Sequence, residues 1–170
     1  QTGMGRTGAW FDHLRAGVKP DLLTVAKGLG GGFPIGACIG IGAAGELLKP
    51  GNHGTTFGGN PLASAAANAV IDVIENDNIL QHINHLSALF VGELEAAPGV
   101  EAVVGHGLLL GVILSQPIAA RVQSLLLDAG VIVNAPTPDR LRLAPPFILS
   151  DADARSAIAS IITVISEALA

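Results

Sequence analysis

The chain has 170 residues, of which 49% are hydrophobic and 14% charged, and its formal net charge at pH 7 is −5. This composition supports a sizeable core and argues against disorder, and the absence of a basic run argues against nucleic-acid binding. The single cysteine, Cys38, excludes an internal disulfide and a cysteine-based zinc cluster, which suits the cytoplasm. We expect no membrane helix, because the apolar stretch 29–44 is rich in glycine and contains Pro34.

The first half of the chain alternates loops with short apolar segments. The chain begins with Gln1 and not with an initiator methionine, and its first residues resemble a segment from the middle of a folded protein. We therefore expect it to be a piece of a longer polypeptide. Strands are predicted over 22–26, which we expect to be buried, and over 33–41. A helix is predicted to begin at Asn60-Pro61, because Asn is a favoured N-cap and Pro is favoured at the first helical position.

The second half has a different texture. A helix predicted over 79–97 ends at Pro98-Gly99. Strands are predicted after it over 100–104, 108–114, 131–133 and 140–143. One helix is predicted over 118–128, and a last helix is predicted to begin at a capping box formed by Ser150 and Asp153. We therefore predict a domain boundary near residues 90–100. Residues 1–95 would be the end of a large α/β domain, and residues 96–170 a smaller α+β domain.

Lys27 stands alone in an apolar region. It is the only charged residue between Asp21 and Glu46, and the glycine-rich run 28–36 follows it directly. Burying an ammonium is costly unless it is paired or neutralised. Desolvation lowers the pKa of an amine, and a neutral amine can form a Schiff base with an aldehyde. A snorkelling lysine or a structural ion pair would explain the same isolation. The run is not a P-loop, because no Gly-Lys-Ser/Thr closes it.

Four ordered segments resemble one enzyme family. Residues 21–37, which include Thr-Val-Ala-Lys-Gly-Leu-Gly-Gly-Gly, are similar to the cofactor-lysine signature of the class III aminotransferases. These are pyridoxal-phosphate enzymes of the aspartate-aminotransferase fold, called fold type I. Residues 1–8 resemble the stretch after the aspartate that pairs with the pyridine nitrogen. Residues 53–61 resemble the phosphate-contacting loop, and residues 142–146 the substrate-carboxylate segment. The resemblance implies the end of the large α/β domain followed by the small α+β domain.

The resemblance also implies a role for five residues. Lys27 would hold the cofactor covalently and, once freed, move a proton between substrate and cofactor. Gln1 would donate from its amide to the phenolic oxygen of the cofactor ring. Thr56 would reach the cofactor phosphate of a neighbouring subunit, with Thr55 close behind and near the substrate, which implies a homodimer with shared active sites. Arg142 would bind the α-carboxylate of 2-oxoglutarate or glutamate through two parallel hydrogen bonds. Without the resemblance, Thr55 and Thr56 would be interpreted as part of an ordinary turn. Arg142 would be as compatible with a structural salt bridge as with a binding site.

Within the family, residues 1–8 and 24–32 are most similar to the acetylornithine aminotransferases. This implies transfer of the terminal amino group of N-acetylornithine to 2-oxoglutarate, giving N-acetylglutamate semialdehyde and glutamate, in arginine biosynthesis. Ornithine, succinylornithine, diamine and 4-aminobutyrate aminotransferases remain alternatives, as does a catalytically incomplete fragment. His82 and His85 lie on a predicted helix without matching acidic residues, so we expect no metal site, and we expect Cys38 in the core.

Overall fold

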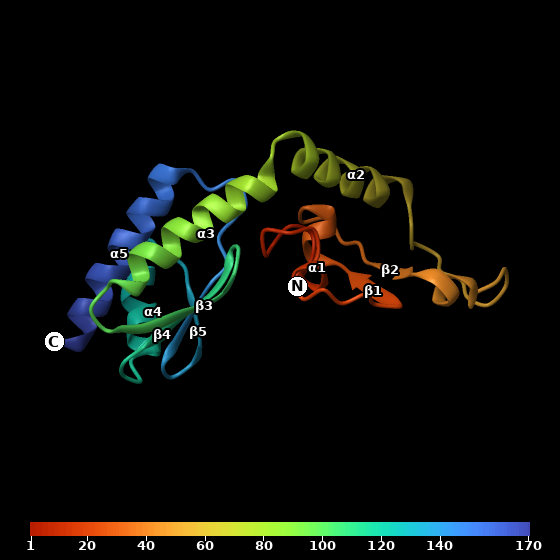
Figure 1. Ribbon diagram of the computed structural model, residues 1–170. Coiled ribbons are helices and arrows are strands. Elements are labelled where there is room, and N and C mark those ends of the chain that lie inside the picture. The colour runs from red at the N-terminus through yellow and green to blue at the C-terminus, as the bar shows by residue number, and fades with distance from the viewer. The chain divides into compact units, whose positions relative to one another are not determined.

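The computed structural model describes residues 1–170, and the chain divides into two compact units, Gln1–Leu80 and Gln81–Ala170 (Figure 1). The division falls earlier than the boundary expected after residue 95, because most of helix α3 (Ile79–Glu95) is tied to the second unit. Arg155 donates a 2.7 Å hydrogen bond to Glu93 of this helix. The assignment of the units to a large and a small domain stays a prediction. None of the helices combines the length and apolar character that crossing a membrane requires.

The first unit contains a two-stranded sheet and one long helix. Its elements are α1 (Asp12–Arg15), β1 (Leu22–Val25), the 3-10 helix η1 (Lys27–Gly30), β2 (Ala37–Gly40), the 3-10 helix η2 (Gly42–Glu46) and α2 (Pro61–Asn76). Strands β1 and β2 are antiparallel, with Leu22 opposite Gly40 and Val25 opposite Ala37. Both predicted strands therefore exist, although each is shorter than expected.

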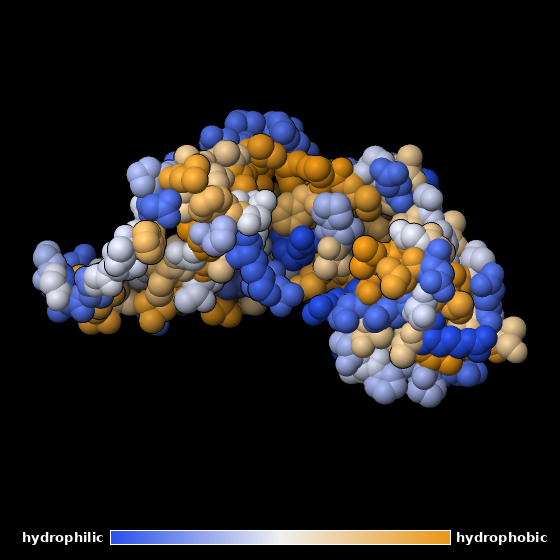
Figure 2. Space-filling model, turned by 180° about the vertical axis from the view of Figure 1, so that it is seen from behind, coloured by the Kyte–Doolittle hydropathy of each residue, from blue (hydrophilic) through white to orange (hydrophobic).

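The sheet of the first unit is largely exposed. All four residues of β2 are exposed, Cys38 among them, and Leu22 of β1 is 59% exposed. The hydrophobic residues that this unit does bury are Met4, Leu29, Ala63, Ala67, Ile74 and Ile79. The expectations of a buried first strand and a core Cys38 are wrong for this chain, because no second layer of residues 1–80 covers the sheet. Figure 2 shows hydrophobic side chains at the molecular surface.

Helix α2 begins where the sequence predicts. The Asn60 side-chain oxygen accepts a 3.0 Å hydrogen bond from the backbone N–H of Ala63, and Pro61 occupies the first helical position. Ala63, Ala67 and Ile74 of the helix are buried. The helix packs against η1, so it fixes the turn that carries Lys27.

The second unit is a four-stranded antiparallel sheet with three helices. Besides α3, its elements are β3 (Val100–His106), β4 (Leu109–Leu114), α4 (Ala119–Asp128), β5 (Asn134–Thr137), β6 (Arg140–Leu143) and α5 (Asp151–Leu169). The strand order is β3-β4-β6-β5. The strand predicted over 131–133 is wrong, because β5 begins only at Asn134. Helix α5 starts as predicted, with the Ser150 hydroxyl oxygen accepting a 3.1 Å hydrogen bond from the backbone N–H of Asp153.

The two faces of this sheet differ. Leu110 of β4 lies opposite Leu143 of β6, and Val112 lies opposite Leu141; all four residues are buried. The alternate positions point to the other face, where Gly111 lies opposite Arg142 and Ile113 opposite Arg140. The helices add further large buried residues, among them Ile83, Leu86, Phe90 and Leu94 of α3, Val122 and Leu126 of α4, and Ile158, Ile161 and Ile165 of α5. One face therefore carries the core, and the other carries two exposed arginines.

Candidate functional site

Lys27 opens a tight turn at the end of β1. The backbone is extended at Ala26 and turns into the 3-10 helix η1 at Lys27. The turn is closed by a 3.0 Å hydrogen bond from the Leu29 N–H to the Ala26 carbonyl, and Leu29 is buried. Gly31 has a φ of 58°, and a Cβ added there would lie 2.9 Å from Cγ2 of Val70 on α2. The glycine-rich run thus lets η1 pack closely on α2.

Two residues at this place have an uncommon backbone conformation. Lys27 has a φ of 49° and Met4 a φ of 53°, and both lie in the left-handed region that residues other than glycine seldom adopt. The third such residue is Asn78, whose side chain tolerates this region. Left-handed residues of this kind cost roughly 1–3 kcal/mol each and gather at functional sites.

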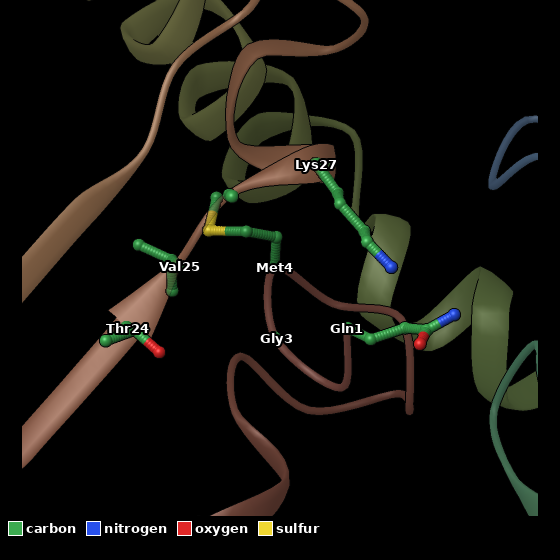
Figure 3. A pocket seen from close by; sticks show the side chains of 8 residues that line it. Gln1, Gly3, Met4, Thr24, Val25 and Lys27 are labelled. Atoms are coloured by element: carbon green, nitrogen blue, oxygen red, sulfur yellow. The ribbon is translucent and has the colours of Figure 1, made fainter.

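A small pocket joins these two residues. It has a volume of about 30 Å³ and is lined by Gln1, Gly3, Met4, Thr24, Val25, Ala26, Lys27 and Gly28 (Figure 3). This volume has room for water but not for a cofactor or substrate, so such a ligand would have to lie outside the mouth of the pocket. Figure 3 shows the side chains of Lys27 and Gln1 directed to the same side, away from β1. The structure therefore brings a primary amine and a carboxamide together.

The surroundings of Lys27 differ from those expected. Ala26, Lys27 and Gly28 are exposed, so the apolar setting from which we expected desolvation is not formed within this chain. The reason is again that the sheet has only two strands and no covering layer. The alternative of a structural ion pair also fails, since the ion pairs of the chain involve Arg15, Lys49, His85 and Arg155 and not Lys27.

The two threonines lie on a separate exposed loop of the first unit. The Thr55 hydroxyl oxygen accepts a 3.1 Å hydrogen bond from the Gly58 N–H, and the Asn60 amide donates a 3.0 Å bond to the Phe57 carbonyl. These bonds fix the loop immediately before α2. Thr56 is exposed, and its hydroxyl has no hydrogen-bond partner within the chain. Thr55 therefore shapes the loop and keeps its hydroxyl hydrogen for a ligand, and Thr56 is available to a ligand as well. Neither residue lines the pocket of Lys27.

Arg142 belongs to the second unit and lines a pocket of its own. This pocket has a volume of about 360 Å³, and its walls are mainly apolar, with Phe90, Leu143 and Ile161 among them. Arg142 is exposed and pairs with no carboxylate of the chain, so the structural salt bridge considered from sequence is not formed. An exposed and unpaired guanidinium can bind a carboxylate ligand by donating two parallel hydrogen bonds to it.

The histidines of α3 have partners that the sequence did not suggest. His85 lies 2.7 Å from the Asp151 carboxylate, and His82 lies 2.9 Å from the Leu149 carbonyl. The expectation of no acidic partner is wrong because Asp151 is distant in sequence but begins α5 beside α3. The hydrogen bond with His85 is the main cause that holds the pKa of Asp151 below its ordinary value. No group of three His, Cys, Asp or Glu side chains is arranged to hold a metal ion.

Sequence reasoning gave no role to Met4, which lies beside Lys27 and is only 4% exposed. The one available signal was its position as an apolar residue between Gly3 and Gly5 in a polar, glycine-rich turn. Burial of the half-buried Arg6 in the same turn lowers its pKa, but a guanidinium remains charged at neutral pH.

Comparison with known proteins connects this site to a family. The family model described as aminotransferase class-III matches residues 1–165. The acetylornithine aminotransferase of Streptomyces coelicolor is 52% identical over 154 residues, which cover 89% of this chain and 38% of that protein.

Two solved structures are also similar. The acetylornithine aminotransferase from Elizabethkingia anophelis superposes with a TM-score of 0.88 at 32% identity, over 98% of this chain and 46% of that one. The ornithine aminotransferase from Toxoplasma gondii superposes with a TM-score of 0.89 at 32% identity, over 99% of this chain and 42% of that one. That structure is described as showing partial occupancy of PLP, pyridoxal phosphate, at its active site. The chain thus spans about two fifths of the length of these proteins.

Proposed function

Because this chain belongs to the class III aminotransferase family and shares its fold, we propose that it forms part of an acetylornithine aminotransferase. The longer polypeptide transfers the terminal amino group of N-acetylornithine to 2-oxoglutarate, giving N-acetylglutamate semialdehyde and glutamate, a reaction of arginine biosynthesis. The observation that carries the proposal is the shared pocket mouth of Lys27 and Gln1 in a chain of this family. The identity to curated acetylornithine aminotransferases supports the choice of amino donor.

Pyridoxal phosphate is the cofactor that these residues fit. Its aldehyde requires a primary amine, which Lys27 supplies, and its ring oxygen requires a hydrogen-bond donor, which the Gln1 amide supplies. Neither side chain is engaged in an ion pair or hydrogen bond within the chain, so both are available. When bound, the cofactor supplies an electron sink for the carbanion formed at the substrate carbon.

The steps performed by this chain follow from the placement of its side chains. Lys27 would hold the cofactor through Nζ, and the same Nζ, once free, would take the proton from the substrate carbon that bears the amino group and pass it to the cofactor. The Gln1 amide orients the cofactor ring.

The remaining two sites bind charged groups. The free hydroxyl of Thr56 donates a hydrogen bond to the cofactor phosphate of a second subunit. Thr55 holds the loop in shape through its hydrogen bond with Gly58. This arrangement makes the enzyme a homodimer with shared active sites. Arg142 binds a carboxylate of 2-oxoglutarate with its unpaired guanidinium. The single cysteine is compatible with a cytoplasmic enzyme.

A second candidate is ornithine aminotransferase, which the structural similarity to the Toxoplasma gondii enzyme favours. Succinylornithine, diamine and 4-aminobutyrate aminotransferases share the same reaction class. The residues 1–170 taken alone are expected to be inactive, because Lys27 is exposed and the two strands beside it are exposed or only half-buried instead of enclosed.

The test compares amino donors with the full-length protein and 2-oxoglutarate. We expect kcat/KM for N-acetylornithine to exceed those for ornithine and 4-aminobutyrate by about tenfold or more, the factor that about 1.4 kcal/mol of differential binding gives. A higher kcat/KM for ornithine would replace the proposal by the second candidate. No transfer from any of these amines would overturn the assignment to the reaction class.

A further inference from the structure

Two turns that are far apart in the sequence meet at the pocket of Lys27. One contains Met4 and the other contains Lys27, and each of these residues has the left-handed backbone described above. Asn78 is less informative, since asparagine commonly adopts this conformation. Such conformations persist only where the surrounding structure enforces them. The contacts of Met4 therefore bear on how the turn of Lys27 is held and on where the Lys27 side chain points.

Met4 lies directly against the turn of Lys27. Its side chain is buried, with 4% exposed, in a unit that buries few large residues. A Cβ added at Gly28 would lie 3.4 Å from Cβ of Met4, so the backbone that follows Lys27 rests on Met4. Figure 3 shows the thioether of Met4 directed toward β1 beside Val25, while Lys27 and Gln1 are directed to the opposite side. Met4 thus fills the closed side of the pocket and leaves the open side to the amine.

We propose that Met4 is a positioning residue, which holds the turn of Lys27 in its left-handed form and thereby aims Nζ at the mouth shared with Gln1. This inference rests on the proposed function, because it concerns the reaction that Lys27 performs there. A purely structural Met4 would affect the stability of the fold and the yield of folded protein but not the chemistry of each folded molecule.

Three substitutions separate side-chain packing from backbone conformation. Met4→Leu keeps a large flexible apolar side chain. Met4→Ala keeps the Cβ that faces Gly28 but removes the buried thioether arm, and Met4→Gly removes the Cβ as well and relieves the left-handed backbone. If the buried thioether arm of Met4 is what holds the turn of Lys27, Leu is tolerated, whereas Ala and Gly both fail. Ile74→Ala serves as a matched control, since Ile74 is a buried residue of the same unit that does not line the pocket.

The experiment uses the full-length protein loaded with pyridoxal phosphate. For Met4→Ala and Met4→Gly we expect kcat to fall roughly ten- to a hundredfold, as displaced catalytic groups cause, while KM for 2-oxoglutarate stays within about twofold. The visible circular dichroism of the bound cofactor, per mole bound, should weaken in the same two variants, because it reports how the cofactor is held. Met4→Leu and Ile74→Ala should match the wild type in both measurements, although Ile74→Ala should melt at a lower temperature.

The proposal and the proposed function can fail separately. Borohydride reduction and peptide mapping of each variant show which lysine holds the cofactor. Attachment to a different lysine in the wild type would overturn the proposed function and this inference with it. Attachment to Lys27, with wild-type kcat and dichroism in Met4→Ala, would overturn the role of Met4 alone. If Met4→Ala does not fold, Met4→Gly decides, and wild-type behaviour of Met4→Gly contradicts the proposal.

Discussion

Replacing Arg142 by alanine should weaken the binding of 2-oxoglutarate. Arg142 stands on the open face of the second sheet, opposite Gly111, and pairs with no carboxylate of the chain. Its removal therefore breaks no internal ion pair, and the whole effect can be assigned to the ligand. The measurement is KM for 2-oxoglutarate in the full-length protein at saturating amino donor.

The size of the effect distinguishes two situations. An ion pair that stays as exposed as Arg142 is in this chain is worth about 1 kcal/mol or less, or roughly fivefold in affinity. A charge-assisted hydrogen-bonded pair covered by its surroundings is worth about 1.5–3 kcal/mol, or roughly 10- to 150-fold. We predict the larger range, because a working aminotransferase must exclude water from the site.

Arg140 provides a matched control on the same strand. Its side chain lies on the same face as Arg142, is also exposed, and forms no ion pair. Arg140→Ala should raise KM by less than about fivefold, as expected for an exposed charge. Equal KM values in Arg142→Ala and the wild type, or equal increases in both arginine variants, would refute the role of Arg142.

Three further substitutions test other parts of the structure. Gly31→Ala should lower the free energy of unfolding by about 1–3 kcal/mol, because its Cβ would meet Val70 at 2.9 Å, and Val70→Ala in the same chain should restore part of the loss in urea denaturation. Asn60→Ala should lower the free energy of unfolding by about 1 kcal/mol through loss of the N-cap. It should also weaken pyridoxal-phosphate binding, measured by equilibrium dialysis, because the loop of Thr56 becomes looser. Unchanged cofactor affinity would show that this loop does not bind the phosphate. Asp151→Asn should lower the urea midpoint at pH 7, where the Asp151 carboxylate is ionised and bonded to His85. Because the folded state holds the pKa of Asp151 below the ordinary 3.8, this stabilisation is lost as the pH falls through the folded-state pKa, and equal differences at pH 7 and pH 2 would contradict it.

Local signals predicted those elements whose cause is local. Helix α2 begins at Asn60-Pro61 and α5 at Ser150 because the capping side chains act within three residues of themselves. Strand β6 (Arg140–Leu143) matches its predicted range, since alternating leucines and arginines separate a buried face from an exposed one.

Strand β5 was missed because long-range pairing creates it. The apolar segment 131–133 was predicted as a strand, but Asn134–Thr137 pairs with β6 despite containing Pro136. Its Ala135 N–H donates a 2.6 Å hydrogen bond to the side chain of Gln123 on α4. No pattern within the segment itself indicates either partner.

The site was predicted only in part. The proximity of Gln1 to Lys27 follows from the family resemblance, because nothing in the local sequence brings these two residues together. The expected burial of Lys27 is wrong for this chain, since apolar strands such as β1 become buried only when further layers cover them. The contact of Met4 with Gly28 could not be foreseen either, because a left-handed methionine has no sequence signature.

The central claim is that Lys27 carries the cofactor, and the three lysines of this chain allow a direct test. The full-length protein and its variants Lys19→Ala, Lys27→Ala and Lys49→Ala would each be loaded with pyridoxal phosphate, reduced with borohydride and weighed by mass spectrometry. We predict that the cofactor remains attached to the wild type and to the Lys19 and Lys49 variants but not to Lys27→Ala. Stoichiometric attachment to Lys27→Ala would contradict the account.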